Sequence, residues 1–403
     1  MVQPSDNMSE TAPRADGAPP QTRFGLILLL WLAGLGAAAQ YGKVAVVFDM
    51  LPAAYPGAGA VLGWAVSLVG VVGIGLGVVA GVVVARVGLK RAMVWGLLGG
   101  AILSGIQGIV PPLWIFLPLR IVEGLFHLAL VVAAPTLISQ VAAPQHRGFA
   151  LTLWGTFFGV AFALIAALGI PLAQAHGIGA LFWAHSLWML VFALLLAWRL
   201  PSDEPTDPAP VSLAALWSSS VRLYVSPRIG AAAWGWLFYT FSFVSLLTLI
   251  PPFIPETART ATLTAMPLVS IAASMVLGVA LLRVMSAVQV VLIGFVAAAL
   301  CVAGLLLWPG HPAVCLITAA ALGLVQGASF AAVPELNVAP ADRALANGGM
   351  AQMGNLGNTL GVPVLAAGIA LAGLPGLVLP LVLALALGTA THLWLAARRR
   401  DQT

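Results

Sequence analysis

Three ionisable residues follow one another at helical spacing inside an apolar stretch long enough to cross a membrane. Arg120, Glu123 and His127 are three and four residues apart, which places their side chains on one helical face. A charge at membrane depth costs about 2.5–3.5 kcal/mol, so each needs a reason to be there. We interpret the group as a binding and proton site: Arg120 holds an anionic or carbonyl group, and the other two exchange protons. The alternative is an Arg120–Glu123 pair that neutralises itself.

Two more polar residues lie near the end of the first apolar stretch. Gln40 and Lys43 are predicted to face an internal cavity and to contribute to substrate or proton binding. The alternative for Lys43 is that its long side chain extends to the lipid headgroups, because its position corresponds to the outer third of the membrane.

The second half of the chain offers amides where the first half offers charges. The predicted binding residues there are Gln326, Gln352, Asn355 and Asn358. Amides facing a cavity can both donate to and accept from a polar, uncharged solute. The alternative is hydrogen bonding between helices. Aromatic residues between Trp234 and Phe243 can stack on a planar solute or pack between helices.

The composition shows which elements must position these residues. Of the 403 residues, 61% are hydrophobic and only 7% are charged, whereas a soluble domain has about 25% charged residues. The excess apolar surface must face lipid, so the chain is predicted to be an integral membrane protein. The continuous apolar runs exclude a porin-like barrel. Scattered basic residues argue against nucleic-acid binding, and the sequence has no spacing of Cys and His that suggests a metal site.

The apolar runs predict an all-α protein with twelve transmembrane helices, each of about 20 residues or more. The first six are expected near Phe24–Met50, Ala60–Ala85, Ala92–Val110, Trp114–Val141, Phe149–Ala173 and Gly179–Trp198. The second six are expected near Ile229–Ile250, Thr262–Leu282, Gln289–Trp308, Ala313–Pro334, Ala344–Ala372 and Gly376–Ala397.

The basic residues predict the topology of these spans. With a cytoplasmic N-terminus, the only basic residue in an outer loop is Arg259, and Lys43 and Arg120 fall inside helices. The cytoplasmic side then carries Arg14, Arg23, Arg86, Lys90, Arg91, Arg147, Arg199, Arg222, Arg228, Arg283, Arg343, Arg398, Arg399 and Arg400. Both termini are therefore predicted to be cytoplasmic.

Polar segments divide the chain into five parts. Residues 1–23 are predicted to be a disordered cytoplasmic tail, 24–198 a six-helix bundle, 199–228 a cytoplasmic linker, 229–397 a second bundle and 398–403 a short tail. The bundles echo each other, since Glu123-Gly124 and a later Pro135 correspond to Gln326-Gly327 and Pro334. Two repeated halves around a central cavity are the plan of many secondary transporters.

A loop motif carries a family resemblance. The segment Gly81-Val-Val-Val-Ala-Arg86-Val-Gly88-Leu-Lys90-Arg91 resembles the cytoplasmic loop signature G-x-x-x-D-R-x-G-x-K/R-K/R of the major facilitator superfamily. Arg120 followed by Glu123-Gly124 resembles the helix-4 signature of the same family. The loop differs at Ala85, where the family usually has an Asp that takes part in a charge lock. The resemblance implies that Gly81, Arg86, Gly88, Lys90 and Arg91 form a gating loop.

The resemblance also implies a function and a location. It implies a secondary transporter of the bacterial inner membrane that works by alternating access, as a monomer surrounded by lipid, on a small-molecule substrate. No ATP-binding P-loop occurs, so we expect proton-coupled uptake and no cofactor. A small polar or planar solute is expected, such as a riboflavin-like vitamin or an organic anion.

Three alternatives stay open. The fifth helix has Gly155-Thr-Phe-Phe-Gly159 without the Pro that follows in drug/proton antiporters, which disfavours an exporter but leaves it open. The other two are a non-transporting scaffold or sensor and a polytopic membrane enzyme. Finally, Gly73, Gly77 and Gly81 form a stripe at four-residue spacing, which predicts a surface for helix contact.

Overall fold

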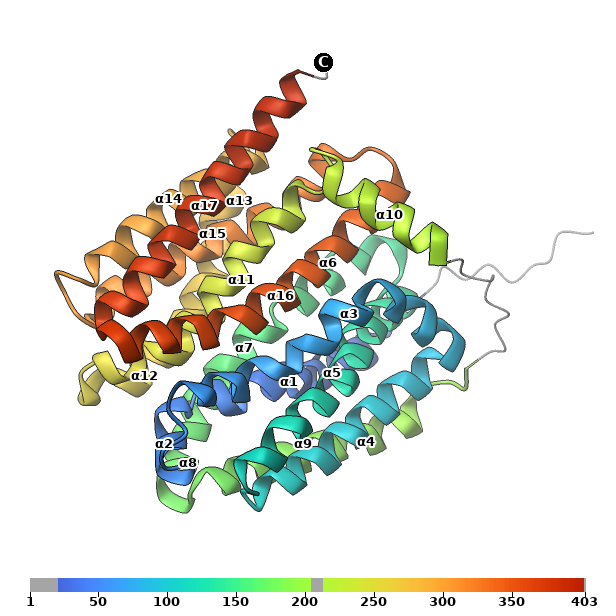
Figure 1. The fold of residues 1–403 in the computed structure, drawn as a ribbon. Helices are drawn as coiled ribbons and strands as arrows, with labels where there is room; N and C mark the ends of the chain where they lie inside the picture. Colours follow the sequence, from blue (N-terminus) through green and yellow to red (C-terminus); the bar gives the residue numbers. More distant parts are fainter. Residues whose placement is uncertain (1–20, 204–212, 402–403) are drawn as a thin grey trace, which may run out of the picture.

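A computed structural model describes residues 21–203 and 213–401, and within these ranges it contains helices and no strand. Twelve helical spans within these ranges are long and apolar enough to cross a membrane, so the predicted all-α architecture is confirmed. The helices form two groups, which we call the N-half and the C-half and which occupy the lower and upper parts of Figure 1. The predicted tail at 1–23 falls almost entirely outside the described residues.

The N-half provides the first six spans. They are formed by α1 (Phe24–Ala45), η2 with α3 (Gly59–Leu62 and Gly63–Val87), α4 (Leu89–Gly108), α5 (Leu113–Val141), a broken fifth span and α9 (Ile178–Arg199). The fifth span consists of α6 (Pro144–Gly155), α7 (Phe157–Leu164), the π-helical turn η3 (Ile165–Gly169) and α8 (Ile170–His176).

The C-half provides the other six spans. They are formed by α11 (Ala231–Leu249), a broken eighth span, α14 (Ala287–Gly304), α15 (Pro312–Leu336), α16 (Pro340–Ala372) and α17 (Leu374–Arg400). The eighth span consists of α12 (Glu256–Ala272), the π-helical turn η5 (Ala273–Gly278) and α13 (Val279–Leu281). The fifth and eighth spans, which face each other, thus each contain a π-helical turn.

One predicted span ends too late. The first span ends at Ala45 instead of Met50, and the short helices η1 (Phe48–Met50) and α2 (Leu51–Ala54) follow it. Pro52 lies in the first turn of α2, where a proline is tolerated because that turn has no intrahelical partner for the N–H group. The predicted linker contains a helix, α10 (Leu213–Val225), which is held to the C-half by Leu223, a buried side chain against Gly349 and Ala233. Residues 204–212 of the linker lie outside the described residues.

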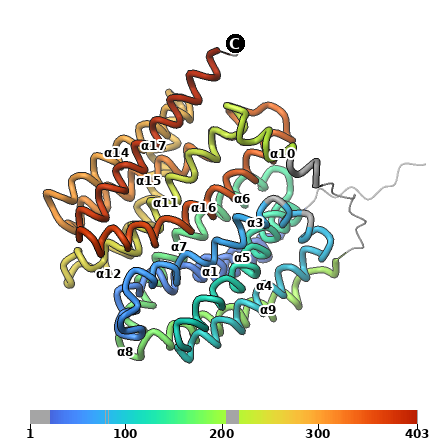
Figure 2. The backbone as a smooth tube through the Cα atoms, in the orientation of Figure 1, coloured from blue at the N-terminus to red at the C-terminus, as the bar shows by residue number. Residues whose placement is uncertain are grey.

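The two halves meet along α3 and α16, which lie side by side in Figure 2. A Cβ on Gly63 would lie 2.9 Å from the Cα of Pro363. Further along the seam, the Ser67 hydroxyl donates to the Asn358 carbonyl at 3.1 Å. The seam ends where the Gln352 amide donates to the Ile74 carbonyl at 3.0 Å. Because these contacts involve glycines and backbone atoms, the two helices approach closely.

Beyond Ile74 the halves diverge toward the end of the bundle that carries Arg86, Lys90 and Arg91, which we call the basic end. A Cβ on Gly73 would clash with Asn355, but one on Gly77 or Gly81 would have nothing within 4 Å. The predicted glycine stripe is therefore a contact surface only at Gly73. In this conformation the other two glycines lie past the point where α3 leaves α16.

The second seam follows the same pattern. A Cβ on Gly159 of α7 would lie 2.8 Å from Ile271 of α12. Toward the basic end, Gly148 and Gly155 of α6 have nothing within 4 Å of a Cβ. Both seams are thus closed at mid-depth and at the end opposite the basic end, which we call the outer end.

An ion pair joins the halves at the outer end. The Arg259 guanidinium of α12 lies 3.5 Å from the Asp49 carboxylate of η1. Partial burial raises the pKa of Asp49, and the Arg259 charge opposes that rise.

A buried charge cluster as the candidate functional site

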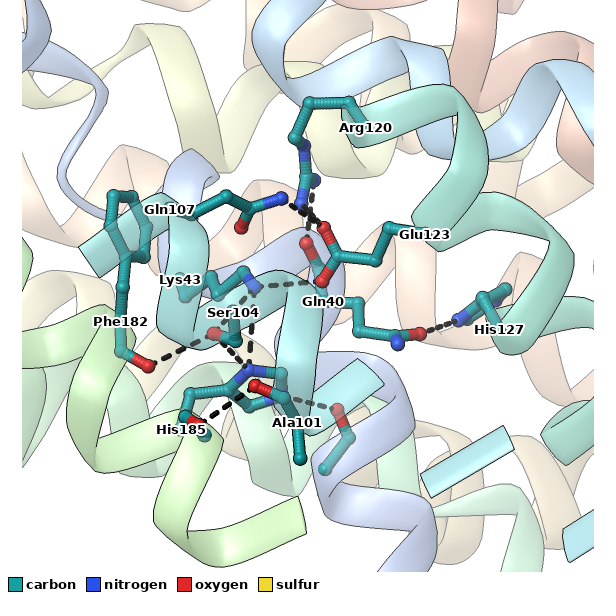
Figure 3. Close-up of polar contacts among 12 residues, drawn as sticks. Gln40, Lys43, Ala101, Ser104, Gln107, Arg120, Glu123, His127, Phe182 and His185 are labelled. Atoms are coloured by element: carbon teal, nitrogen blue, oxygen red, sulfur yellow. Dashed lines mark hydrogen bonds and ion pairs between the residues drawn. The ribbon is translucent and has the colours of Figure 1, made fainter. Parts of the chain in front are cut away.

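Glu123 is the centre of a cluster of charged and polar side chains inside the N-half. Its carboxylate accepts from the Lys43 ammonium at 2.7 Å, from the Gln107 amide at 2.7 Å, and from the Arg120 guanidinium. Figure 3 shows these groups converging from α1, α4 and α5. The side chains of Lys43, Arg120 and Glu123 are all completely buried.

Arg120 uses its remaining contacts to join helices. Its Nε donates to the Ala65 carbonyl of α3 at 2.6 Å, and its Nη2 donates to the Gln40 carbonyl of α1 at 2.6 Å. The Arg120–Glu123 pair, the sequence-based alternative to a binding site, therefore forms, and Arg120 also joins α5 to α3 and α1. Any anion that binds Arg120 directly must first displace one of these partners or use its remaining N–H groups.

Lys43 points inward and does not extend to the membrane surface. Besides Glu123, its Nζ lies 2.9 Å from the Ser104 hydroxyl and 3.3 Å from Nδ1 of His185. Ser104 in turn donates to the Phe182 carbonyl at 2.9 Å, and His185 Nε2 lies 2.9 Å from the Gly36 carbonyl. The ammonium thus has one acceptor for each of its three N–H bonds.

The cluster carries an excess of positive charge. It has two cationic side chains, Lys43 and Arg120, and one carboxylate, Glu123. With His185 neutral, one positive charge is left without a partner of opposite sign at the depth of the membrane. A buried charge of this kind attracts an anion through the low-dielectric surroundings, even without direct contact.

The spacing of His127 groups it with Arg120 and Glu123, but its hydrogen-bond partners are on α1. Its Nδ1 lies 3.0 Å from the Ala37 carbonyl and 3.1 Å from Oε1 of Gln40. Both partners are acceptors, so Nδ1 carries the proton and Nε2 is left as an acceptor. The ring also meets Tyr41 edge-on, with centroids 5.2 Å apart. A role of His127 in proton exchange remains a prediction.

The predicted amides of the C-half lie apart from the charge cluster and have structural contacts. Gln352 bonds the Ile74 carbonyl and also accepts from the Tyr224 hydroxyl of α10 at 2.6 Å. Asn355 packs on Gly73 and donates to the Ala351 carbonyl of its own helix. Asn358 has a buried Oδ1 without a hydrogen-bond partner, so it is the amide best able to accept from a solute. Gln326 is half-buried in α15.

The predicted gating loop contains a contact that its sequence does not show. Gly88 has a φ of 98°, a conformation that favours glycine, and α4 begins directly after it. The carboxylate of Asp203, from the linker, accepts from the backbone N–H groups of Lys90 at 2.8 Å and Arg91 at 3.1 Å. An acidic group is therefore present at the loop although Ala85 does not supply it. It comes from a different part of the chain, and its contacts stay within the N-half, where it caps α4. Gly81 and Arg86 are exposed.

Sequence reasoning missed three members of the cluster: Ser104, Gln107 and His185. Each carried a signal, because each is a polar residue inside an otherwise apolar helix. Ser104 and Gln107 are also three residues apart on α4, as Arg120 and Glu123 are on α5. Among the described residues, no group of three or more His, Cys, Asp or Glu side chains is arranged to hold a metal ion.

Comparison with known proteins identifies the family. A sequence model of the Major Facilitator Superfamily matches residues 26–336, so the chain belongs to this superfamily. A crystal structure of a bacterial homologue of the human lysosomal transporter Spinster, inward-facing and occupied, superposes with a TM-score of 0.72 at 15% identity. That superposition covers 94% of this chain and 98% of the other. The inward-facing and unoccupied structure gives 0.66 at 14% identity, covering 93% and 95%. These similarities show the fold.

Two relatives are similar in sequence over shorter segments. One, from Bacillus subtilis (strain 168), is named as a niacin/nicotinamide transporter, NiaP, and is 26% identical over 179 residues, which is 42% of this chain and 43% of the relative. The other is the inner membrane transport protein YajR of Escherichia coli (strain K12), 29% identical over 119 residues, or 30% of this chain and 26% of the relative. The alignments thus span less than half the length of either relative.

Proposed function

We propose that the protein is a secondary transporter that takes up a small organic anion together with a proton by alternating access. The observation that carries this proposal is the buried cluster around Glu123, because its uncompensated positive charge suits an anionic solute. The closed outer end and the diverging basic end are what one state of an alternating-access cycle requires.

The solute class follows from the charge and from one relative. A small aromatic carboxylate such as nicotinate combines a single negative charge with a planar ring. The relative named for niacin and nicotinamide transport makes it the first solute to test. Within the proposed site, Arg120, Glu123 and Lys43 supply the charge, while Gln40, His127 and Asn358 supply neutral polar contacts. The rings of Trp236 and Tyr239, with centroids 4.6 Å apart, offer an aromatic surface in the C-half.

The orientation is part of the proposal. The distribution of Arg and Lys supports a cytoplasmic position for the basic end, and with that orientation the conformation described here is inward-open. The inner membrane location agrees with the name of the Escherichia coli relative.

The test is uptake of radiolabelled nicotinate into liposomes that contain the purified protein. We expect uptake that increases when the outside is more acidic than the inside. Glu123→Gln should lower it about tenfold or more, since a neutral amide disrupts the charge balance. The matched control is Ser329→Ala, which removes a buried hydroxyl from α15 of the C-half and should leave uptake unchanged.

Two results would contradict the proposal. Uptake of other small solutes without uptake of any organic anion would overturn the solute class. Absence of transport for every solute tried, with a folded protein, would favour a scaffold or sensor instead.

A further inference from the structure

His185 of α9 is the histidine that contacts the charge cluster directly among the described residues. Its Nδ1 lies 3.3 Å from Lys43 Nζ and 2.8 Å from Ser104 Oγ. Because its Nε2 faces the Gly36 carbonyl, an acceptor, Nε2 carries the ring proton. The Nδ1 lone pair then faces both the ammonium and the Ser104 hydroxyl, whose one proton can go to Nδ1 or to the Phe182 carbonyl. A proton donor and a basic acceptor thus face each other inside the membrane.

Lys43 and His185 are also the part of the cluster that has space beside it. A hollow lies between α1, η3 and α9. It is lined mainly by apolar side chains, among them Leu164, Ile165 and Leu168, and its two ionisable lining residues are Lys43 and His185. The rim is exposed, with Leu168 at 68%. Arg120 and Glu123, in contrast, do not line it, and their positions are fixed by contacts with neighbouring helices.

Charge balance indicates what a proton at this position would do. With Lys43 protonated, the cluster has a charge of plus one, which a bound monoanion cancels. With Lys43 neutral, Arg120 and Glu123 cancel each other and the empty site is also neutral. Moving a net charge through a low-dielectric membrane is costly, so a carrier that is neutral both loaded and empty avoids that cost.

We propose that Lys43 and His185 form a dyad that holds one exchangeable proton, and that this is the proton coupled to anion uptake. This inference rests on the proposed function and adds to it the position of the coupling proton. Glu123 remains ionised beside Arg120 throughout, and its role is to keep the charge of the cluster fixed.

One proton leaves the dyad in two transfers. An N–H bond of the Lys43 ammonium breaks, and its proton forms a bond to Nδ1 of His185, which leaves a neutral amine and an imidazolium. The imidazolium Nε2–H then leaves the Gly36 carbonyl, this N–H bond breaks, and its proton passes to a water molecule that enters the hollow and becomes hydronium. The dyad has lost one proton and no electron, and the cluster has changed from plus one to neutral.

The groups that surround this proton come from α1, α4, α5, α7 and η3, in addition to α9. α1 supplies Lys43, and α5 supplies Glu123 and Arg120 at or next to the ammonium. α4 contributes Ser104, which is neutral, and the residues of α7 and η3 that line the hollow are apolar. The proton is therefore controlled mainly by one carboxylate and one guanidinium.

The sharpest variant is Lys43→Arg, because arginine keeps the positive charge but does not release a proton in the physiological range. In liposomes with nicotinate as the probe, Lys43→Arg and His185→Gln should each lower accumulation driven by a proton gradient about tenfold or more. Exchange of labelled for unlabelled nicotinate at equal pH should fall at least about threefold less than accumulation in each variant, because exchange needs no net proton movement.

His392→Gln is the matched control, since His392 is a buried histidine of the C-half outside the proposed site. It should retain both accumulation and exchange. The proposal is overturned if Lys43→Arg still accumulates nicotinate with native pH dependence. It is equally overturned if Lys43→Arg and His185→Gln lose exchange as fully as accumulation, because that pattern indicates a structural role.

A measurement without any solute separates this inference from the proposed function. Nitrogen NMR of ¹⁵N-histidine-labelled protein in lipid bilayers reports which ring nitrogen carries a proton, and the signal missing from His185→Gln identifies His185. We expect this signal to change with pH in the native chain and to stop changing in Lys43→Arg. An identical response in both would overturn the dyad, even in a protein that transports nicotinate. The expected response in a protein that transports nothing would support the dyad and refute only the transport function.

Discussion

Gly124 of α5 packs directly on α3 in the N-half, and Gly323 of α15 packs in the same way on α12 in the C-half. A Cβ on Gly124 would lie 2.3 Å from the carbonyl oxygen of Val69, and one on Gly323 would lie 2.1 Å from that of Ser270. The two halves thus share a packing plan. Their buried polar residues differ, because the N-half contains Lys43, Arg120 and Glu123 while the buried polar residues of the C-half are mainly Ser and Thr.

This comparison distinguishes the need for close helix packing from the need for a buried ion cluster. Close helix packing is needed in both halves, and small residues provide it in both. A buried ion cluster is needed only once, and a second copy would add desolvation cost without a new function. The comparison therefore predicts that packing variants act alike in the two halves and that charge variants do not.

The largest expected effect is on the charged half. Glu123→Gln leaves two buried cations without their carboxylate and should lower the free energy of unfolding by about 3–5 kcal/mol. Adding Lys43→Met should restore part of that loss, since it returns the cluster to a single excess charge. Thermal and denaturant unfolding of the single and double variants in detergent would measure both effects. Equal stability of Glu123→Gln and the native chain would refute the cluster as a coupled unit.

A smaller effect, equal in the two halves, is expected for Gly124→Ala and Gly323→Ala. Each introduces a methyl group against a backbone oxygen, and each should cost about 1–3 kcal/mol. Gly77→Ala is the control, because nothing lies within 4 Å of its Cβ, and it should leave stability unchanged or raise it by up to about 1 kcal/mol. Unfolding midpoints would show this, and a large cost in only one half would break the packing comparison.

The smallest effect concerns the ion pair that joins the halves. The Asp49–Arg259 pair is partly exposed, so it should contribute only about 0.2–1 kcal/mol. It requires ionised Asp49, and burial raises the pKa of that carboxyl. Acid therefore weakens the pair, beginning at a higher pH than for an ordinary carboxylate.

Spin labels can test this effect at the outer end. With Cys301 and Cys315 replaced by Ala, labels at the exposed positions Val61 and Leu371 report the separation of the halves. The distances should spread to larger values as the pH falls in the native background. In Asp49→Asn the distances should be spread at every pH. If neither the lower pH nor the substitution alters the distance distribution, the pair does not hold the halves together.

Much of the fold could be predicted from the sequence because membrane spans depend on local composition. The twelve runs and the pairing of Arg120 with Glu123 follow from hydropathy and from three-residue spacing, both properties of a single helix. The contact of Lys43 with Glu123 joins residues 80 positions apart. It depends on how α1 packs against α5, and no local pattern determines that packing.

The same reasoning explains the other differences. Asp203 reaches the loop at Lys90 from 113 residues away, so the missing acidic residue at Ala85 gave no hint of it. His185 was overlooked because one histidine in an apolar helix has no periodic partner, although its partners on α1 and α4 are close in space.

The excess positive charge of the cluster makes one state of the carrier, empty with Lys43 protonated, sensitive to the membrane voltage. A potential of 100 mV acts on one elementary charge with about 2.3 kcal/mol across the full membrane. Movement of the N-half that carries this charge through part of the field therefore changes the balance between inward-facing and outward-facing states, even with no solute bound. When Lys43 is neutral, this pull on the cluster vanishes, so the empty carrier would return at a rate that voltage does not alter.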